Sequence, residues 1–357
     1  MNSVARYHMP AEWEKHEGTW LQWPHNKEYQ GHQLQYERMW LMMVDVLRRH
    51  ENVHIIAVDE RHREHIEYQL GYFKIGLENV DLCIIPNNDV WVRDNGPIYV
   101  VDERGELAAT NWQFNGWGNR FPHELNDRVP AAIAALTSVP LLNPPLVLEG
   151  GAVEVNGSGT LLATRSSIIN PNRNPSKSQE EIEAMLRQFL GVTHFIWLTG
   201  AGGKEIDKWG GVTDSHIDGS ARFTDETTVL YNWTDDSSDP RYPMFAQLKH
   251  ELEEAMTEAG ECLTLIPLPV PRNGVYQISE NKAWRKAKLT VGTYCNYYVA
   301  NEVILVPVFG NVNDERAKAI IAEQFPDRKV IGIDAVGLVE EGGAIHCVTQ
   351  QQPAVTA

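Results

Sequence analysis

The stretch LEGGAVEVNGSGTLLATR (residues 148–165) combines a polar start, two β-type segments and the turn sequence NGSG. A helical period of apolar residues follows in SQEEIEAMLRQFLG (178–191), and a compact apolar run, THFIWLTG, comes next at 193–200. Glycine and asparagine between two β-type segments indicate a hairpin, and apolar residues three and four positions apart indicate a helix. Residues 148–200 therefore predict a hairpin, a helix and a strand, in that order.

The same order recurs along the chain and decides the fold class. Hairpin patterns recur in WVRDNGPIYVVDERGELAATNWQF (91–114), HIDGSARFTDETTVLYNW (216–233) and TYCNYYVANEVILVPVFG (293–310). Helix-then-strand patterns recur at 35–59, 244–269 and 314–336, and EGGAIHCVT (341–349) matches the first half of one more copy. About five such units predict an α/β fold. Closing them in a ring would bring the start of every hairpin to a common centre.

The composition limits the class of partner and the compartment. The chain has 357 residues with 31 basic and 48 acidic side chains, and its formal net charge of −17 disfavours nucleic acid and anionic membranes and favours a cationic ligand. The four cysteines are far apart and form no CxxC pair, so neither a zinc framework nor a disulfide scaffold is predicted. No apolar run reaches membrane-spanning length. We therefore expect a protein of the reducing cytoplasm.

Five polar side chains stand at or near the starts of the predicted hairpins. They are Asp94, Glu149, His216, Asp218 and Cys347. Polar residues before a strand are most often turn formers, which explains one or two of the five well and all five poorly. The alternative is that the ring brings them together in one pocket.

Cys347 lies in the polar stretch EGGAIHCVTQQQP (341–353), which makes it the candidate nucleophile. Burial in the core remains the commoner explanation of a lone cysteine, because cysteine is among the most buried residue types. Cys83 in VDLCIIP and Cys262 in ECLTLIPLP belong to apolar runs, and both are predicted to be core residues. Cys295 in TYCNYYV is compatible with a strand near the site.

His216 and Asp218 in TDSHIDG are two positions apart, so on a strand both would point to one face. A histidine beside a thiol can carry protons near neutral pH, and a carboxylate can bind a cation. A turn explains this pair equally well.

Asp94 lies in NNDVWVRDNGP (87–97), where Asp89 and Arg93 could form a local ion pair. A buried carboxylate needs a positive partner, and the guanidinium of a substrate would supply one in bidentate form. Glu149 precedes two glycines, which would let a ligand approach the backbone closely.

Together these motifs resemble one known family. The resemblance covers nearly the whole chain, from MPAEWEKHEGTWLQWP (9–24) to Pro353. Its motifs are NNDVWVRDNGP (87–97), WQFNGWG (112–118), LEGGAVEV (148–155), NPNRNPS (170–176), SHID (215–218) and GGAIHCVTQQQP (342–353). The chain is identified as a member of the agmatine deiminase family, which adjoins the bacterial-type peptidylarginine deiminases in the guanidino-group-modifying superfamily.

The resemblance implies a five-bladed α/β propeller with pseudo-fivefold symmetry, the pentein fold, formed by a single catalytic domain over residues 1–357. It implies no metal and no organic cofactor. Trp91 would line the pocket. His346, next to Cys347 on the predicted strand, should face away from it, because adjacent strand residues point to opposite faces.

The resemblance also implies a role for each of the five polar residues. Cys347 would be the nucleophile and His216 the general acid and base. Asp94 and Asp218 would hold the nitrogens of a guanidinium group. Glu149 would contact the guanidinium and help to orient the histidine.

The reaction implied is hydrolysis of agmatine to N-carbamoylputrescine and ammonia through a cysteine thiouronium, a step of putrescine biosynthesis. Three alternatives stay open: arginine, free or in a peptide, as the substrate; an amidinotransferase; and a binding protein without activity. Free arginine needs a cationic partner for its carboxylate, and an inactive relative usually lacks one of the five residues. We expect a small cationic guanidino ligand, no nucleic acid or membrane partner, and allow for a homo-oligomer.

Overall fold

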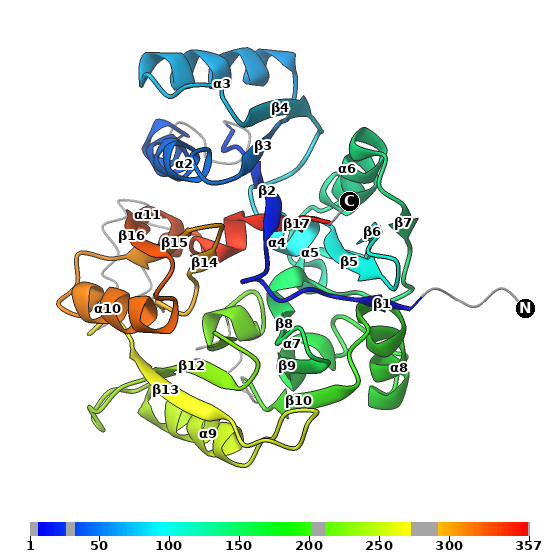
Figure 1. Cartoon of the computed structure of the whole chain (residues 1–357), viewed down its shortest axis with the longest axis vertical. Coiled ribbons are helices and arrows are strands. Elements are labelled where there is room, and N and C mark those ends of the chain that lie inside the picture. Colours follow the sequence, from blue (N-terminus) through cyan, green and yellow to red (C-terminus); the bar gives the residue numbers. More distant parts are fainter. Residues whose placement is uncertain (1–5, 26–32, 201–210, 273–291, 356–357) are drawn as a thin grey trace, which may run out of the picture.

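The computed structural model describes residues 6–25, 33–200, 211–272 and 292–355, whose strands form five separate small sheets and no single closed sheet. The sheets follow one another around the molecule in sequence order (Figure 1). In spatial order their strands are β1 (Tyr7–His8), β5 (Ile98–Asp102), β6 (Leu107–Thr110) and β7 (Leu141–Leu142); β10 (His194–Leu198), β9 (Thr160–Thr164) and β8 (Val153–Val155); β11 (Ala221–Phe223), β12 (Thr228–Trp233) and β13 (Thr264–Pro269); β14 (Tyr298–Val299), β15 (Val303–Val308) and β16 (Lys329–Asp334); β17 (Gln350–Pro353), β2 (His16–Gln22), β3 (Asn52–Ala57) and β4 (Val80–Ile84).

Every sheet combines an antiparallel pair with a parallel pair. In the second sheet Leu162 of β9 lies opposite Glu154 of β8 in an antiparallel pair and opposite Ile196 of β10 in a parallel pair. The other four sheets repeat this pattern of pairing. The predicted succession of hairpin, helix and strand is confirmed. A parallel pair of strands needs a crossover connection, and a helix provides it.

The longer helices connect the parallel strands, and the shorter ones lie in the connecting segments. The longer ones are α2 (Gln33–Leu47), α3 (Glu60–Tyr72), α6 (Val129–Thr137), α8 (Gln179–Leu190), α9 (Tyr242–Glu253) and α10 (Asp314–Gln324). The shorter ones are α4 (Val92–Asn95), α5 (Gly116–Asn119), α7 (Arg165–Ile168) and α11 (Val336–Glu340).

Helix α8 shows how the sequence sets these elements. Ser178 and Glu181 form a reciprocal capping box at its start, which satisfies backbone donors that the first turn leaves open. Ile182, Leu186 and Leu190 recur every four residues and are buried against the sheet. Gly191, with a φ of 71°, ends the helix in the left-handed conformation that glycine adopts without strain.

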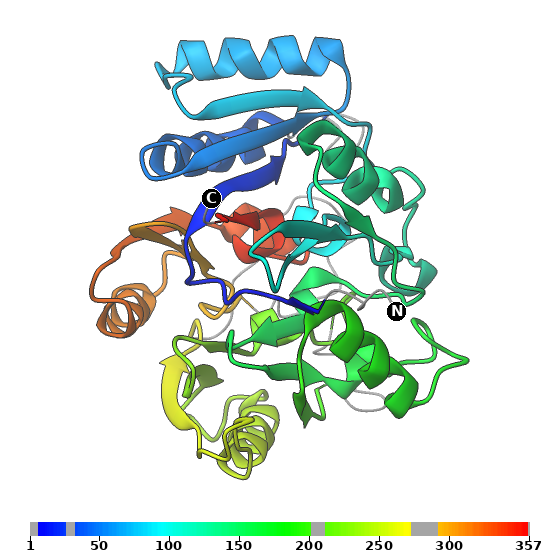
Figure 2. The same ribbon diagram turned by 45° about the vertical axis from the view of Figure 1, so that its right-hand side comes forward.

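The two ends of the chain build the fifth sheet together. Strand β17 pairs antiparallel with β2, with Gln351 opposite Thr19. The prediction that residues 341–349 begin one more copy is confirmed, and the N-terminal strand β2 supplies the other half of the hairpin. The dark blue segment between β1 and β2 runs through the middle of the molecule (Figures 1 and 2).

Apolar side chains pack between neighbouring sheets rather than at one centre. Leu21, Val53 and Ile304, for example, bring the fifth and fourth sheets into one buried cluster. Similar clusters join the first sheet to the second, the fifth to the first, and the second to the third. Because the apolar residues are used between the sheets, polar side chains can occupy the hairpin starts.

Candidate active site

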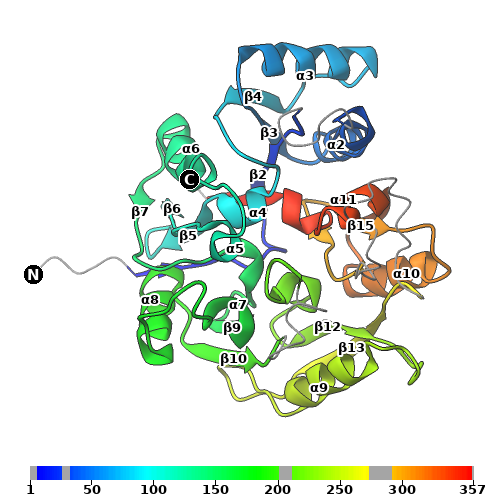
Figure 3. The same ribbon diagram turned by 180° about the vertical axis from the view of Figure 1, so that it is seen from behind.

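The five candidate residues lie on short helical turns just before the hairpins. Viewed from behind, α4 and the C-terminal residues lie near the middle of the molecule (Figure 3). Asp94 is in α4, Glu149 precedes the 3-10 helix η2 (Gly150–Ala152), His216 precedes and Asp218 lies within η5 (Ile217–Gly219), and Cys347 lies in η6 (His346–Val348). The sequence left a strand and a turn open for His216 and Asp218, and the structure has the turn: a 3-10 helix carries Asp218 before β11 begins.

Three of these side chains converge beside Gly151. A Cβ atom at Gly151 would lie 2.7 Å from Nδ1 of His216, 2.9 Å from Oδ1 of Asp94 and 3.0 Å from Oδ2 of Asp218. Real Cβ atoms do not approach polar atoms so closely, so only glycine fits. The sequence predicts that the glycine pair admits a ligand. In the structure the protein's own side chains use the space at Gly151.

His216 lies between two carboxylates. Its Nδ1 atom is 3.6 Å from Oδ1 of Asp94, and its Nε2 atom is 3.5 Å from Oε2 of Glu149. Burial lowers the pKa of His216, but Asp94 and Glu149 outweigh burial and raise this pKa to about 9. The imidazole is therefore protonated at neutral pH. Both nitrogen–oxygen distances exceed those of hydrogen bonds, so the ring can transfer its protons.

Asp94 is buried and accepts two hydrogen bonds from neutral groups. The indole Nε1 of Trp117 donates to Oδ2 at 2.9 Å, and the backbone N–H of Gly151 donates to Oδ1 at 3.1 Å. Burial raises the pKa of Asp94, and His216 offsets this only in part because Asp218 and Glu149 add negative charge. A bound cation would therefore be strongly attracted here.

The thiol of Cys347 faces an amide and a carboxylate. Its Sγ atom lies 3.4 Å from Oδ1 of Asn296 and 3.8 Å from Oδ2 of Asp218, and Asn296 also donates to Asp218 at 3.1 Å. Burial, with the charges of Asp218 and Asp94, raises the pKa of the thiol well above its ordinary value. The nucleophile candidate is therefore a neutral thiol until positive charge arrives.

A cavity of about 460 Å³ opens over Cys347 and Asp94. Trp91 and Trp117 line it. The Trp91 ring lies directly over Gly343, where a Cβ atom would come within 2.3 Å of the ring carbon Cζ3. Flat aromatic walls and a charged floor fit a flat, delocalised cation.

The charged side chains that line the cavity are acidic among the described residues. Asp89, Asp94 and Glu341 line the cavity, and no lysine or arginine does so among the described residues. The carboxylate of Asp89 accepts hydrogen bonds from Asn95 at 3.0 Å and Asn126 at 2.7 Å, and burial raises its pKa to about 7. A bound cation would hold Asp89 in its charged form, so the wall favours a ligand with positive charge.

A model of the Porphyromonas-type peptidyl-arginine deiminase family matches residues 8–353. The chain belongs to this family. Agmatine deiminases of Pseudomonas aeruginosa and Pseudomonas syringae pv. tomato are each 32% identical to it, over 98% and 99% of this chain and 96% and 98% of their own. The solved agmatine deiminase of Enterococcus faecalis is 27% identical with a TM-score of 0.86, covering 97% of this chain and 96% of that one. An amidinotransferase from Microseira wollei, 11% identical, covers 99% of both chains with a TM-score of 0.51 and shares the fold alone.

Two arginines in this member of the deiminase family were not singled out by the sequence. Arg173 donates to Oε1 of Glu149 at 2.6 Å and to Oδ2 of Asp214 at 2.7 Å, and Arg120 donates to both oxygens of Asp214 at 2.9 Å. Arg173 belongs to the NPNRNPS motif. The sequence singled out this motif but did not indicate the role of its arginine. The pair Arg173–Glu149 holds the carboxylate that faces His216.

The prediction for His346 is wrong. His346 begins the 3-10 helix η6 rather than sitting on a strand, and its ring turns toward the site: Nδ1 is 2.8 Å from Oδ2 of Asp218. The suggested ion pair of Asp89 with Arg93 does not form either. Arg93 instead reaches Glu12 at 3.3 Å and Gln351 at 2.7 Å.

The other cysteines differ from one another. Cys262 is exposed, so its prediction as a core residue is wrong, because strand β13 begins only at Thr264, two residues after it. The prediction of Cys83 as a core residue is confirmed only in part: it is half-buried on the edge strand β4 and packs against a buried cluster. Cys295 is buried beside Asn296, the residue that contacts Cys347, and burial raises the pKa of its thiol to about 12.

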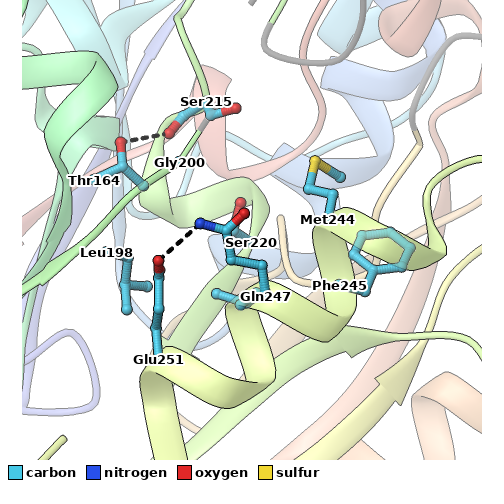
Figure 4. Close-up of a pocket in the computed structure, with 10 residues that line it drawn as sticks. Thr164, Leu198, Gly200, Ser215, Ser220, Met244, Phe245, Gln247 and Glu251 are labelled. Atoms are coloured by element: carbon cyan, nitrogen blue, oxygen red, sulfur yellow. Dashed lines mark hydrogen bonds between the residues drawn. The ribbon is translucent and has the colours of Figure 1, made fainter. Parts of the chain in front are cut away.

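A second cavity is lined by Ser215 and Ser220 and by side chains of α9, among them Met244 and Glu251 (Figure 4). It measures about 30 Å³, room for about one water molecule. Thr164 donates to the backbone carbonyl of Ser215 on its wall at 2.7 Å. Among the residues that the structure describes, no cluster of three or more histidine, cysteine or acidic side chains could hold a metal ion, and no helix is long and apolar enough to span a membrane.

Proposed function

We propose that this member of the family hydrolyses agmatine to N-carbamoylputrescine and ammonia, a reaction of putrescine biosynthesis. The observation that carries the proposal is the Cys347 thiol beside Asp218 at the floor of a cavity whose described charged lining residues are all acidic. Relatives named agmatine deiminase support the substrate. Free arginine would bring a carboxylate to a wall of carboxylates, which disfavours it.

In the first half-reaction the guanidinium group binds between Asp94 and Asp218 beneath Trp91. Its positive charge offsets the two carboxylates that hold Cys347 in the thiol form, so the thiol loses its proton to solvent. The thiolate forms a bond to the central guanidinium carbon and gives a neutral tetrahedral adduct. His216 donates a proton to one amino group, the C–N bond breaks, and ammonia leaves. A cationic thiouronium on Cys347 and a neutral His216 remain.

In the second half-reaction neutral His216 removes a proton from water, and the hydroxide adds to the thiouronium carbon. The adduct collapses when the C–S bond breaks, and the hydroxyl proton is released. The products are a ureido compound, the thiolate and a protonated His216, as at the start. Glu149, held by Arg173 at 2.6 Å, faces His216 in both halves and stabilises its protonated form.

We also propose that the five sheets are the blades of a pseudo-fivefold α/β propeller. The recurrence of one pairing pattern in five separate sheets supports this arrangement, as does the placement of each candidate residue on the turn that leads into an antiparallel strand pair. The ring would explain why residues as far apart in sequence as Asp94 and Cys347 line one cavity.

The test is to incubate the protein with agmatine, measure ammonia release and identify the ureido product by mass spectrometry. Protein quenched in acid during turnover should carry the substrate-derived amidine on the peptide containing Cys347. Turnover without this adduct, or with the adduct on another residue, would reject the proposed nucleophile. Absence of ammonia release from agmatine would reject the substrate.

A further inference from the structure

A buried carboxylate from the N-terminal segment lies beneath the site. Glu12 is 7% exposed, and its Oε2 atom is 2.7 Å from Nε2 of His346, 3.0 Å from Nη2 of Arg222 and 3.3 Å from Nη2 of Arg93. Its Oε1 atom accepts the backbone N–H of Val299 at 2.9 Å. With two guanidinium groups and an N–H as donors, Glu12 is ionised. These donors come from four different sheets or the turns before them.

The ring of His346 connects Glu12 to the catalytic centre. Its Nε2 atom faces Glu12 at 2.7 Å, and its Nδ1 atom faces Oδ2 of Asp218 at 2.8 Å. An ionised carboxylate only accepts hydrogen bonds, so each ring nitrogen must carry a hydrogen. The ring is 1% exposed, and both of its nitrogens face carboxylate oxygens. Each nitrogen is therefore placed to donate, Nε2 to Glu12 and Nδ1 to Asp218.

We propose that His346 is a positioning residue whose ring donates hydrogen bonds to both Glu12 and Asp218, and that it thereby keeps Asp218 ionised and aimed at the substrate. The role of Asp218 in binding the guanidinium rests on the proposed function. The two hydrogen bonds of His346 rest only on the contacts above. His346 then acts through Asp218 and touches no reacting atom.

The two histidines near the site are bound in opposite ways. His216 lies between Asp94 at 3.6 Å and Glu149 at 3.5 Å, too far for fixed hydrogen bonds. His346 lies between its two carboxylates at 2.8 Å and 2.7 Å, the length of charge-assisted bonds. The loose contacts suit a ring that passes protons, and the tight ones suit a ring that keeps them.

The environment of Asp218 shows what the loss of His346 would do. Burial raises the pKa of Asp218, and the hydrogen bond and charge of His346 are the largest effects that lower it, ahead of His216 and Arg222. Asp94 and Cys347 lie on its other side and supply no positive charge. Without His346 the carboxyl would take up a proton more readily, and a neutral carboxyl binds a guanidinium poorly.

The first experiment measures kcat/KM for agmatine between about pH 6 and pH 9, where a buried carboxyl deprived of its cation titrates. We expect His346→Asn to lose roughly 10- to 100-fold, the range typical of groups that orient a charged ligand, with a larger deficit at low pH. The amide of Asp218→Asn cannot take up a proton in this range, so the loss of kcat/KM in this variant should not depend on pH. A His346→Asn profile parallel to that of the unmodified protein would overturn the proposal.

His54→Asn is the matched control. His54 also lies between two carboxylates, Glu17 at 2.9 Å and Asp81 at 3.4 Å, but on β3 and outside the cavity lining. Its loss should leave the pH profile unchanged. If His54→Asn reproduces the profile of His346→Asn, the effect is a general loss of buried charge and the proposal fails.

A second measurement needs no turnover. Nitrogen NMR of the ¹⁵N-histidine-labelled protein should show a hydrogen on both ring nitrogens of His346 at neutral pH. Among the signals of the 13 histidines, that of His346 is the one lost in both His346→Asn and His346→Gln. A ring with one bare nitrogen at neutral pH would overturn the proposal. If agmatine releases no ammonia, the proposed function fails, and this measurement still decides the state of His346.

Discussion

The Sγ atom of Cys347 lies 3.8 Å from Oδ2 of Asp218, so the candidate nucleophile lies next to a negative charge. This contact makes the thiolate unfavourable in the free protein, where burial and the two aspartates already raise the thiol pKa. A bound guanidinium makes the local charge less negative and so favours the thiolate. Reactivity is thereby coupled to the presence of a cationic substrate.

Replacing the sulfur should abolish turnover and leave the fold intact. We expect Cys347→Ser to release no ammonia from agmatine above the rate without protein, because a hydroxyl is far less ionised than a thiol near neutral pH. Circular dichroism and thermal unfolding would establish that the variant folds. Measurable turnover by the folded variant would remove Cys347 from the nucleophile role.

Cys262→Ser is the matched control for this change. Cys262 is exposed and outside the cavity lining, so its replacement should alter neither kcat/KM nor the unfolding temperature. A loss of activity in Cys262→Ser would show that the assay responds to thiol loss in general.

The raised pKa of His216 predicts a pH-dependent contribution to stability. A histidine whose pKa is about 9 in the folded state and about 6.5 in the unfolded state stabilises the fold fully below the lower value and loses this effect as pH rises through the higher one. The difference corresponds to roughly 3 kcal/mol. Denaturant unfolding of His216→Gln and the unmodified protein should therefore give free energies that converge between about pH 6 and pH 10.

The same variant should lose activity deeply. General acid and base catalysis by one group typically contributes about 10²–10⁴-fold, and His216 would serve both half-reactions. Steady-state assays at neutral pH would measure the loss. If His216→Gln retains activity within a few-fold, another group carries the proton.

The fold follows from the sequence because its signals are local and repeated. Hairpin turns, the capping box of Ser178 and Glu181, and the apolar period of α8 each act within a few residues. Repetition then indicates that hairpin starts meet, which places Asp94, Glu149, His216, Asp218 and Cys347 together without knowledge of any contact.

The residues that support the site could not be predicted in the same way. Glu12 and His346 are in contact, yet they lie at opposite ends of the chain, and a single glutamate carries no periodic signal. Asn296 follows Cys295 in the sequence and contacts Cys347 only because a turn precedes β14. Their roles depend on three-dimensional packing between sheets.

Adding one methyl group at Gly151 should disable the site. The Cβ of Gly151→Ala would overlap Nδ1 of His216 at 2.7 Å and Oδ1 of Asp94 at 2.9 Å. Displacing reacting groups by about 1 Å can cost about 10²-fold, so we expect kcat/KM to fall at least this far. Gly71→Ala in α3 is the control, because nothing lies within 4 Å of its Cβ position. Equal activity of the two variants would contradict the predicted crowding.

The last prediction concerns the far end of the substrate. Agmatine carries an ammonium group there, whereas arginine also carries a carboxylate. Asp89 and Glu341 also line the cavity, and no lysine or arginine is among its described lining residues. They should attract the ammonium and repel the carboxylate. We therefore expect kcat/KM for agmatine to exceed that for free arginine by at least two orders of magnitude, on the order of 3 kcal/mol.

Ammonia release measured in parallel on agmatine, free arginine and a blocked arginine peptide would check this preference. Glu341→Gln should narrow the gap between agmatine and arginine, because it removes a negative charge from the wall without changing its shape. The exposed Glu315→Gln on α10, outside the cavity lining, should leave the gap as it is. Equal rates on agmatine and arginine, or faster turnover of the blocked peptide, would refute agmatine as the preferred substrate. The deiminase chemistry at Cys347 would remain, because it depends on the guanidinium that all three compounds share.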